Sequence, residues 1–237
     1  MSEPESRSSG WAEVARATHA PANEADLRIA MAHRYSLMPH ILDFADFPRW
    51  VGARVLEIGC GAGLDGVSFA QAGAEYTGLD ISRAAWTAAR QAFGWMKVDG
   101  NLVHADAAHL MQNVRQASFD LIYCFDALHE MNDPEEVIRQ ARRAIRPTGE
   151  FRLMLPARNS WAVAVGDGDG GFSKTQARTL LRANDYAAMS ITQDYIVPYE
   201  PGSLEQRLPW FAAMTPAMFR KLEQSFGRHL LIRAQPS

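Results

Sequence analysis

Three glycines alternate with small residues directly after a short apolar run, and an acid stands two positions before the first glycine. The run begins at Arg54 and continues as Glu57-Ile58-Gly59-Cys60-Gly61-Ala62-Gly63. An apolar run that ends in glycines and leads into an amphipathic segment predicts a buried strand, a tight turn and a helix. In that geometry backbone N–H groups approach a ligand. We therefore expect the binding site of the chain to be built around this turn.

The turn fits two ligand-binding patterns. Gly61-Ala-Gly63-Leu-Asp-Gly66 satisfies the dinucleotide pattern G-x-G-x-x-G, with Asp80 at the end of the next predicted strand to hold a ribose. The second pattern is acid-x-Gly-x-Gly-x-Gly, which runs from Glu57 to Gly63 and uses the same Asp80. The dinucleotide pattern leaves Glu57 without a role, and the chain has no Tyr-x-x-x-Lys pair for the hydride chemistry of short-chain dehydrogenases. The second pattern is therefore favoured.

Strands and helices alternate around this turn. Strand-like runs cover 54–58, 75–80, 101–105, 119–125 and 150–155, and a helical pattern follows each of the first four. Ser82 and Asp133 are predicted N-caps of two of these helices, and the segment from Pro147 to Gly149 is expected to separate the fourth helix from the fifth strand. The alternation predicts right-handed βαβ crossovers and a doubly wound, mostly parallel sheet, which is an α/β fold.

The segments on either side of this core are expected to complete a single domain. Residues 1–23 are expected to form a mobile leader, and residues 24–50 two short helices joined at Pro39, which make a flap before the first strand. We divide the rest into a cofactor-binding half, 51–156, and a substrate-side half, 157–237. Three predicted elements belong to the second half: a helix that Ser173 caps and that runs through Ala183, a strand over 187–197 and an edge strand over 228–234.

Charge limits the class of partner. The chain has 24 Lys and Arg against 27 Asp and Glu, a formal net charge of -3, which gives no electrostatic basis for binding nucleic acid or an anionic membrane. A small-molecule partner is therefore predicted. No metal site is expected, because the two carboxylates between Gly166 and Gly171 make a poor calcium cage.

Cysteine usage and hydropathy point to the cytoplasm. Cys60 and Cys124 both lie in apolar strand-like runs, which suits reduced thiols better than a disulfide framework. No apolar run approaches the roughly 20 residues that a membrane-spanning helix needs. The first residues also lack the apolar core of a signal peptide, so a cytoplasmic location is expected.

In the acid-x-Gly-x-Gly-x-Gly frame the chain resembles the class I methyltransferases that use S-adenosylmethionine. The segment from Phe119 to Glu130 resembles the fourth-strand signature of the ubiquinone and menaquinone biosynthesis methyltransferases. The segment from Val137 to Arg152 resembles their next helix and fifth strand, where a Pro-x-Gly turn is usual. The resemblance covers roughly residues 34–155 and implies a Rossmann-like sheet of seven strands.

The same resemblance implies which residues hold the cofactor, S-adenosylmethionine, and its product S-adenosylhomocysteine. The implied positions are Gly59, Gly61 and Gly63 for the approach of the backbone, Glu57 beside the methionine part, Asp80 at the ribose hydroxyls, Ile81 on the adenine face, Asp106 and Ala107 at the adenine edge, and Cys124 and Phe125 under the methionine part. Arg34-Tyr35 resembles a flap segment that closes over the cofactor in many relatives, so Tyr35 joins these contacts. Helix capping by Asp80 or Asp106 and core packing by Tyr35 are the alternative interpretations.

Methyl transfer from a sulfonium is an in-line displacement at an activated carbon, so the protein mainly supplies proximity and alignment and needs no metal. A general base helps when the acceptor is a hydroxyl or a protonated nitrogen. His129 is the main candidate, because it follows the fourth strand at the carboxyl edge of the sheet, where such folds bind ligands. Tyr35 and His33 are alternative catalytic residues.

Aromatic side chains of the flap and the late segment favour an aromatic or heterocyclic small metabolite as acceptor, methylated at oxygen or nitrogen. They are Trp11, Tyr35, Phe44, Trp161, Tyr195, Tyr199, Trp210 and Phe211. An NAD(P)-dependent oxidoreductase and a non-catalytic S-adenosylmethionine-binding regulatory subunit are the alternative functions. The sequence leaves the oligomeric state open.

Overall fold

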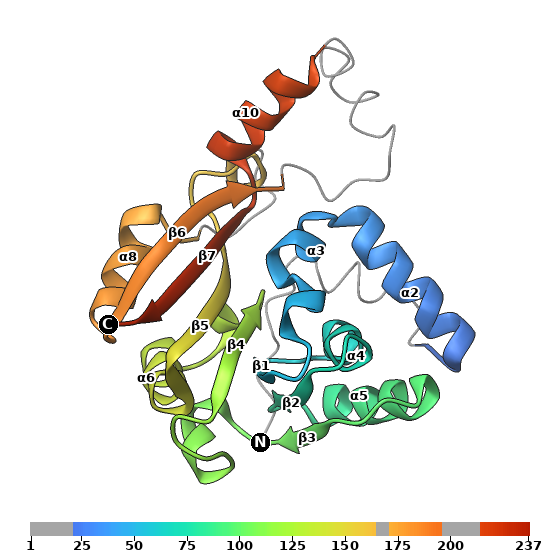
Figure 1. Ribbon diagram of the computed structural model, residues 1–237. Helices are drawn as coiled ribbons and strands as arrows, with labels where there is room; N and C mark the ends of the chain where they lie inside the picture. Colours follow the sequence, from blue (N-terminus) through green and yellow to red (C-terminus); the bar gives the residue numbers. More distant parts are fainter. Residues whose placement is uncertain (1–20, 165–170, 196–213) are drawn as a thin grey trace, which may run out of the picture.

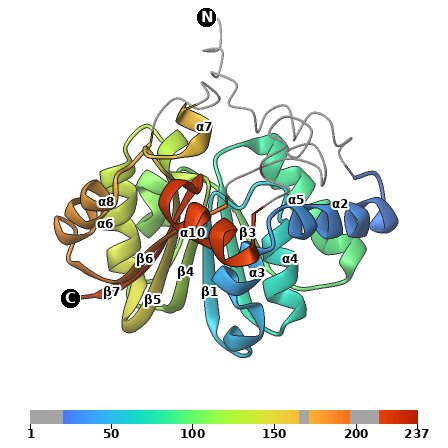
Figure 2. The same cartoon turned by 90° about the horizontal axis from the view of Figure 1, so that it is seen from above.

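A sheet of seven strands lies between two layers of helices (Figure 1, Figure 2). The structure is a computed structural model, and it describes residues 21–164, 171–195 and 214–237. The strands are β1 (Arg54–Ile58), β2 (Glu75–Asp80), β3 (Asn101–His104), β4 (Phe119–Phe125), β5 (Ile145–Pro156), β6 (Tyr186–Asp194) and β7 (His229–Pro236). The helices are α2 (Glu24–Leu37), α3 (His40–Ala45), η1 (Phe47–Trp50), α4 (Leu64–Gln71), α5 (Arg83–Met96), η2 (Ala107–Gln112), η3 (Leu128–Glu130), α6 (Pro134–Ala144), α7 (Trp161–Ala164), α8 (Lys174–Arg182) and α10 (Pro216–Phe226).

The strand order is β3-β2-β1-β4-β5-β7-β6. The first five of these pair in parallel, and β7 runs antiparallel to both of its neighbours. Helices α2 to α5 cover one face and α6 and α8 cover the other (Figure 2). The predicted fold class, a doubly wound and mostly parallel seven-stranded sheet, is confirmed. Within the described ranges, no helix is long and apolar enough to cross a membrane.

Two predicted segments fall largely outside the described part of the chain. The leader over 1–23 is described only from Pro21 onward, and the glycine-rich segment from Gly166 to Gly171 only at its last residue. The flap over 24–50 is described throughout, as α2, α3 and η1, and the chain turns at Pro39 between the first two helices.

The strand predicted over 228–234 is not an edge strand. It is β7, and it lies between β5 and β6, with antiparallel pairing on both sides. Leu230, Leu231 and Ile232 are all buried. An edge strand leaves one row of its backbone groups unpaired, whereas both rows of β7 are paired. The apolar residues of β7 follow one another without alternating with polar ones, which is typical of a strand covered on both faces. The edges of the sheet are β3 and β6.

The Pro147 to Gly149 turn does not interrupt the sheet. Strand β5 already begins at Ile145, and its pairing with β4 shifts between Phe119, opposite Ile145, and Leu121, opposite Glu150. A Cβ at Gly149 would lie 2.6 Å from Cγ1 of Ile145, so only glycine fits inside this bulge. The predicted break is therefore a bulge within a longer strand.

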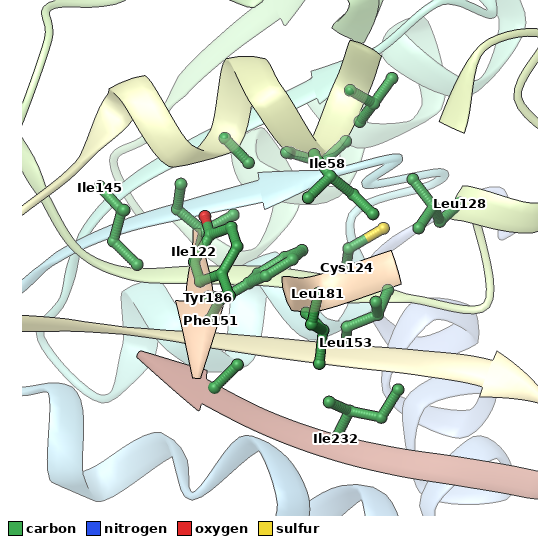
Figure 3. Close-up of a cluster of buried hydrophobic side chains, with 14 of the residues drawn as sticks. Ile58, Ile122, Cys124, Leu128, Ile145, Phe151, Leu153, Leu181, Tyr186 and Ile232 are labelled. Carbon is green, nitrogen blue, oxygen red and sulfur yellow. The ribbon is translucent and has the colours of Figure 1, made fainter. Parts of the chain in front are cut away.

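Apolar side chains between the sheet and helices α6 and α8 form a large core. Figure 3 shows Ile58 of β1, Ile122 and Cys124 of β4 and Phe151 of β5 among them. Cys124 is fully buried and both cysteines are free thiols, which confirms that they pack within the protein. This dense packing holds the strand ends, and thus the loops that follow them, in fixed positions.

A buried arginine attaches the flap to the other face of the sheet. Arg152 of β5 is fully buried, and its Nη1 donates to the carbonyl oxygens of Phe44 and Ala45 at the end of α3. Its Nε donates to Glu150 Oε1 at 2.6 Å, and Glu150 Oε2 also accepts an ion pair from Arg49 at 3.0 Å. A buried carboxylate therefore compensates the charge that caps α3.

Two buried histidines form a second attachment between the flap and the sheet. Nε2 of His40 in α3 lies 2.9 Å from Nδ1 of His229 in β7, and the ring of Tyr195 packs against both. Burial lowers the pKa of His40 to about 4, so the pair is uncharged at neutral pH. His229 is thus a structural residue in this arrangement, and His40 is one that the sequence did not single out.

Glu150→Gln is expected to lower the free energy of unfolding by about 3 kcal/mol, because it leaves the buried Arg152 guanidinium without a counter-charge. Urea denaturation followed by circular dichroism measures this change. The matched control is Glu75→Gln, which breaks an exposed ion pair with Arg54 at 3.3 Å and should cost less than about 1 kcal/mol. Equal effects of the two substitutions would contradict the role given to Glu150.

Candidate functional site

The glycine turn joins β1 to α4 and is open to a ligand at its middle residue. Gly59, Gly61 and Gly63 all have positive φ, at +73°, +55° and +80°. A Cβ at Gly59 would lie 2.4 Å from the Cβ of Ala127, so this glycine lets the loop after β4 pack against the turn. A Cβ at Gly61 would meet nothing within 4 Å. The backbone therefore borders open space at Gly61, which fits a bound molecule.

Asp80 ends β2 and holds the turn in place. Its Oδ2 accepts from the Gly61 N–H at 2.8 Å, and its Oδ1 accepts from the Ser82 N–H at 2.8 Å, just before α5. Each carboxylate oxygen has a second lone pair, so two hydroxyl groups of a ribose still find acceptors there. The next side chain, Ile81, is 64% exposed although it is large and apolar. An exposed isoleucine beside a carboxylate fits the flat face of an adenine.

Asp106 follows β3, the strand beside β2, so it lies at the same edge of the sheet. Its Oδ1 accepts from the Ala108 N–H at 2.9 Å and caps η2. Asp106 therefore does cap a helix, as the alternative interpretation predicted. Its side chain is nevertheless 46% exposed and has further lone pairs that can accept from the amino group of an adenine. Ala107 is buried beneath it.

Glu57 lies against a tyrosine. The carboxyl is buried, and Oε2 accepts from the Tyr76 hydroxyl at 2.6 Å. Burial, and then the nearby carboxylate of Asp65, raise the pKa of Glu57 well above its ordinary value. Its position at the end of β1 agrees with the sequence prediction, and its hydrogen bond ties β1 to β2 from beneath the turn.

Strand β4 ends beside the turn. Cys124 and Phe125 are buried, and Asp126 follows with a left-handed backbone, φ +56°. His129 Nε2 lies 3.1 Å from Glu130 Oε1 and 3.7 Å from Asp126 Oδ1. Nδ1 of His129 is buried and has no hydrogen-bond partner among the described residues. Burial lowers the pKa of His129, so the ring is neutral at pH 7.

The flap reaches the turn through a buried ion pair. Arg34 of α2 donates from Nε to Asp65 Oδ1 at 3.0 Å and from Nη2 to Asp65 Oδ2 at 2.8 Å. The Tyr35 hydroxyl lies 3.1 Å from Asp65 Oδ1 and 2.7 Å from Ser68 Oγ, and the Tyr123 hydroxyl donates to Asp65 Oδ2. Burial raises the pKa of Tyr35, which disfavours its anion. The geometry thus favours a positioning role for Tyr35 over a catalytic one.

Asp65 occupies the N-terminal end of α4, the helix that follows the turn. It stands in the first turn of α4 with its carboxylate buried, and its negative charge is paired with Arg34. The residues at the strand ends fit a ribose and an adenine, which both patterns of the turn would bind.

A family described as a methyltransferase domain matches residues 56–153. Residues 56–153 are therefore a methyltransferase domain, similar to the class I S-adenosylmethionine-dependent methyltransferases. A ubiquinone biosynthesis O-methyltransferase from Pseudomonas aeruginosa is 34% identical over 110 residues, which are 46% of this chain and 46% of the relative. The chain therefore spans about half the length of the curated relatives it matches.

Solved structures share the fold of this chain across most of their length. Magnesium protoporphyrin IX methyltransferase from Synechocystis, solved with bound S-adenosylhomocysteine, superposes with a TM-score of 0.61 at 17% identity and covers 97% of this chain and 95% of its own. An S-adenosylmethionine-dependent methyltransferase from Mesorhizobium loti has a TM-score of 0.56 at 19% identity, over 78% of this chain and 92% of its own.

Three residues of the candidate site were not found from the sequence. Asp65 and Asp126 were not singled out, and Arg34 was noted only as part of the flap segment. Asp126 had a readable signal, because it is an acid directly after a strand, like Asp80 and Asp106. Asp65 had none, because its pairing with Arg34 bridges 31 positions of the chain.

Tyr76→Phe is expected to lower the free energy of unfolding by about 1 to 3 kcal/mol, because it leaves the buried Glu57 carboxyl without its donor. Thermal or urea unfolding measures the change. Tyr35→Phe is a matched control, because the Asp65 carboxylate keeps its two bonds from Arg34 and the loss should be smaller. A Tyr76→Phe protein as stable as the wild type would contradict the support given to Glu57.

Proposed function

We propose that this methyltransferase transfers a methyl group from S-adenosylmethionine to a small-molecule acceptor, at an oxygen or nitrogen of an aromatic or heterocyclic metabolite. The observation that carries the proposal is the grouping of Asp80, Asp106 and exposed Ile81 beside the open turn at Gly61. These groups offer acceptors for a ribose and an adenine. Relatives named ubiquinone biosynthesis O-methyltransferases support a small acceptor that carries a hydroxyl.

Each binding residue takes a defined part of the cofactor in this proposal. The lack of side chains at Gly59, Gly61 and Gly63 lets the backbone approach the cofactor closely. Asp80 accepts hydrogen bonds from the ribose hydroxyls, and Ile81 covers one face of the adenine. The adenine edge meets Asp106 and Ala107, and the methionine part is lined by Cys124 and Phe125. Glu57 supports the turn through Tyr76, and Tyr35 holds the flap against Asp65.

We place the enzyme in the cytoplasm, since both thiols are free.

The chemistry requires alignment more than activation. Bound S-adenosylmethionine supplies a methyl group on a positively charged sulfur. The acceptor's lone pair forms the new bond to the methyl carbon, the electron pair of the broken bond stays on sulfur, and the acceptor's proton must leave. His129 is neutral and is the base that accepts this proton in the proposal; its Nε2 lies 3.1 Å from Glu130 Oε1.

The acceptor class rests on fewer residues than the sequence suggested. Phe44 and Tyr195 are buried in the core, so they do not line an acceptor surface. Trp11, Tyr199, Trp210 and Phe211 lie outside the described residues. The acceptor proposal now depends on the names of the relatives and on Tyr35 and Trp161, which are partly exposed.

Calorimetric titration with S-adenosylhomocysteine and, separately, NADH tests the cofactor. We expect binding of S-adenosylhomocysteine only, weakened about tenfold to a hundredfold by Asp80→Asn, because charged hydrogen bonds to the ribose are lost. Asp99→Asn, an exposed substitution away from the turn, is the control and should leave binding unchanged. Binding of NADH without S-adenosylhomocysteine would refute the proposal.

Turnover with a panel of phenols, catechols and heteroaromatic amines tests the reaction. For an acceptor hydroxyl we expect His129→Gln to lower kcat by about a hundredfold and to leave the affinity for S-adenosylhomocysteine unchanged. If His129→Gln and the wild type have equal kcat values at every pH from 6 to 9, His129 is not the base. A protein that binds the cofactor but methylates nothing in the panel would favour the regulatory subunit instead.

A further inference from the structure

Asp126 is an acid at the carboxyl end of β4 to which the proposed reaction assigns no task. It follows Phe125 directly, and its side chain is only 19% exposed. Its backbone has φ +56°, a left-handed conformation that costs an aspartate about 1 kcal/mol. The strained backbone holds a largely buried carboxyl at the carboxyl edge of the sheet, where the cofactor is proposed to bind. Strain at such a position suggests a function for that carboxyl.

The packing of the neighbouring residues places Asp126 beside the glycine turn. A Cβ at Gly59 would collide with the Cβ of Ala127, the residue after Asp126, at 2.4 Å. Strands β1 and β4 are adjacent in the sheet, so their following loops meet. Asp126 therefore lies where the turn and the end of β4 converge, which is where the proposed function puts the sulfur end of the cofactor.

We propose that the carboxylate of Asp126 is the counter-charge for the sulfonium of S-adenosylmethionine and makes the site prefer the charged cofactor over its neutral product. The inference rests on the proposed function and concerns the same site. S-adenosylhomocysteine has lost the methyl group and the positive charge and is otherwise the same molecule. A carboxylate beside the sulfur therefore attracts one of the two and is nearly indifferent to the other.

Several charged groups face this carboxyl from the surrounding elements. His129 and Glu130 approach from η3, Arg34 from α2 and Arg228 from the residue before β7. Burial raises the pKa of Asp126 to about 7 in spite of the two arginines, which lower it. The free site is therefore partly protonated at neutral pH, and binding of a cation draws the carboxyl into its charged form.

The sign of the pH dependence follows from this linkage. Below pH 7 the neutral carboxylic acid predominates in the free protein, so binding of the sulfonium must displace a proton. Above pH 7 the carboxylate is already present and the charged cofactor binds without that cost. The affinity for S-adenosylmethionine should rise relative to that for S-adenosylhomocysteine as the pH increases through 7.

Dissociation constants from calorimetry at pH 6 and pH 8 test the inference. The probes are S-adenosylmethionine, sinefungin, which carries an amine cation in place of the methylated sulfur, and S-adenosylhomocysteine. For the wild type we expect the ratio of affinities, cation over neutral ligand, to increase about fivefold to tenfold from pH 6 to pH 8. Amino groups common to all three ligands largely cancel in this ratio.

Asp126→Asn should lower the ratio at pH 8 about tenfold, which equals about 1.4 kcal/mol, and should make it independent of pH. Asparagine tolerates a left-handed backbone, so the fold should be retained. Asp185→Asn is the matched control, because Asp185 also has a positive φ, +57°, but is exposed at the start of β6. It should behave like the wild type.

The outcomes separate this inference from the proposed function. A wild-type ratio that stays constant between pH 6 and pH 8, or an Asp126→Asn ratio equal to the wild-type ratio, overturns the counter-charge while binding of S-adenosylhomocysteine keeps the proposed function. A wild type that binds none of the three probes overturns both. If Asp126→Asn fails to fold, the wild-type pH series decides alone.

Discussion

The hydrogen bond from the Gly61 backbone N–H to Asp80 connects the two sides of the proposed cofactor site, together with the backbone bonds that Gly59 and Cys60 donate to Leu79. It joins the turn after β1 to the end of β2, so the turn and the proposed ribose acceptor keep one relative position. The other oxygen of Asp80 binds the chain before α5, and Tyr76 and Glu57 link the same two strands beneath. Because these bonds fix the turn, little ordering remains when a ligand binds.

Acids in this protein divide into two groups by their partners. Asp65 and Glu150 are buried and receive bidentate or paired arginine contacts, which attach the flap to α4 and to β5. Asp80, Asp106 and Asp126 end strands at the carboxyl edge and keep part of their surface exposed. Removing a partner from the first group costs stability, because the remaining charge is buried. The second group is free to meet a ligand, since its members are already held by short local contacts.

Much of this arrangement was readable from local patterns. The strands at Arg54–Ile58, Glu75–Asp80 and Phe119–Phe125 have the predicted bounds, because short apolar runs ending in glycine or aspartate mark parallel strands. The caps at Ser82, Asp133 and Ser173 are also where the sequence placed them. Each of these signals lies within a few residues of the element that it defines.

The errors and omissions involve contacts between distant segments. The interior place of β7 depends on pairing with β5 and β6, which no local pattern encodes. Helix α10 was not predicted, although Thr215 caps it and Pro216 opens it; none of its residues is buried, so no core-facing side of the helix supports these signals. Arg152, Asp65 and His40 are charged or polar side chains whose burial follows only from partners far along the chain.

The position of β7 also has a consequence for how the chain folds. The ribosome makes β6 before β7, yet the two strands that flank β7 are β5 and β6. Until β7 is made, the row of backbone groups on β5 that β7 covers in the folded protein lacks its native partner. Such open edges recruit strands of other chains. Nascent chains that pause before β7 therefore expose a strand edge that the complete sheet covers.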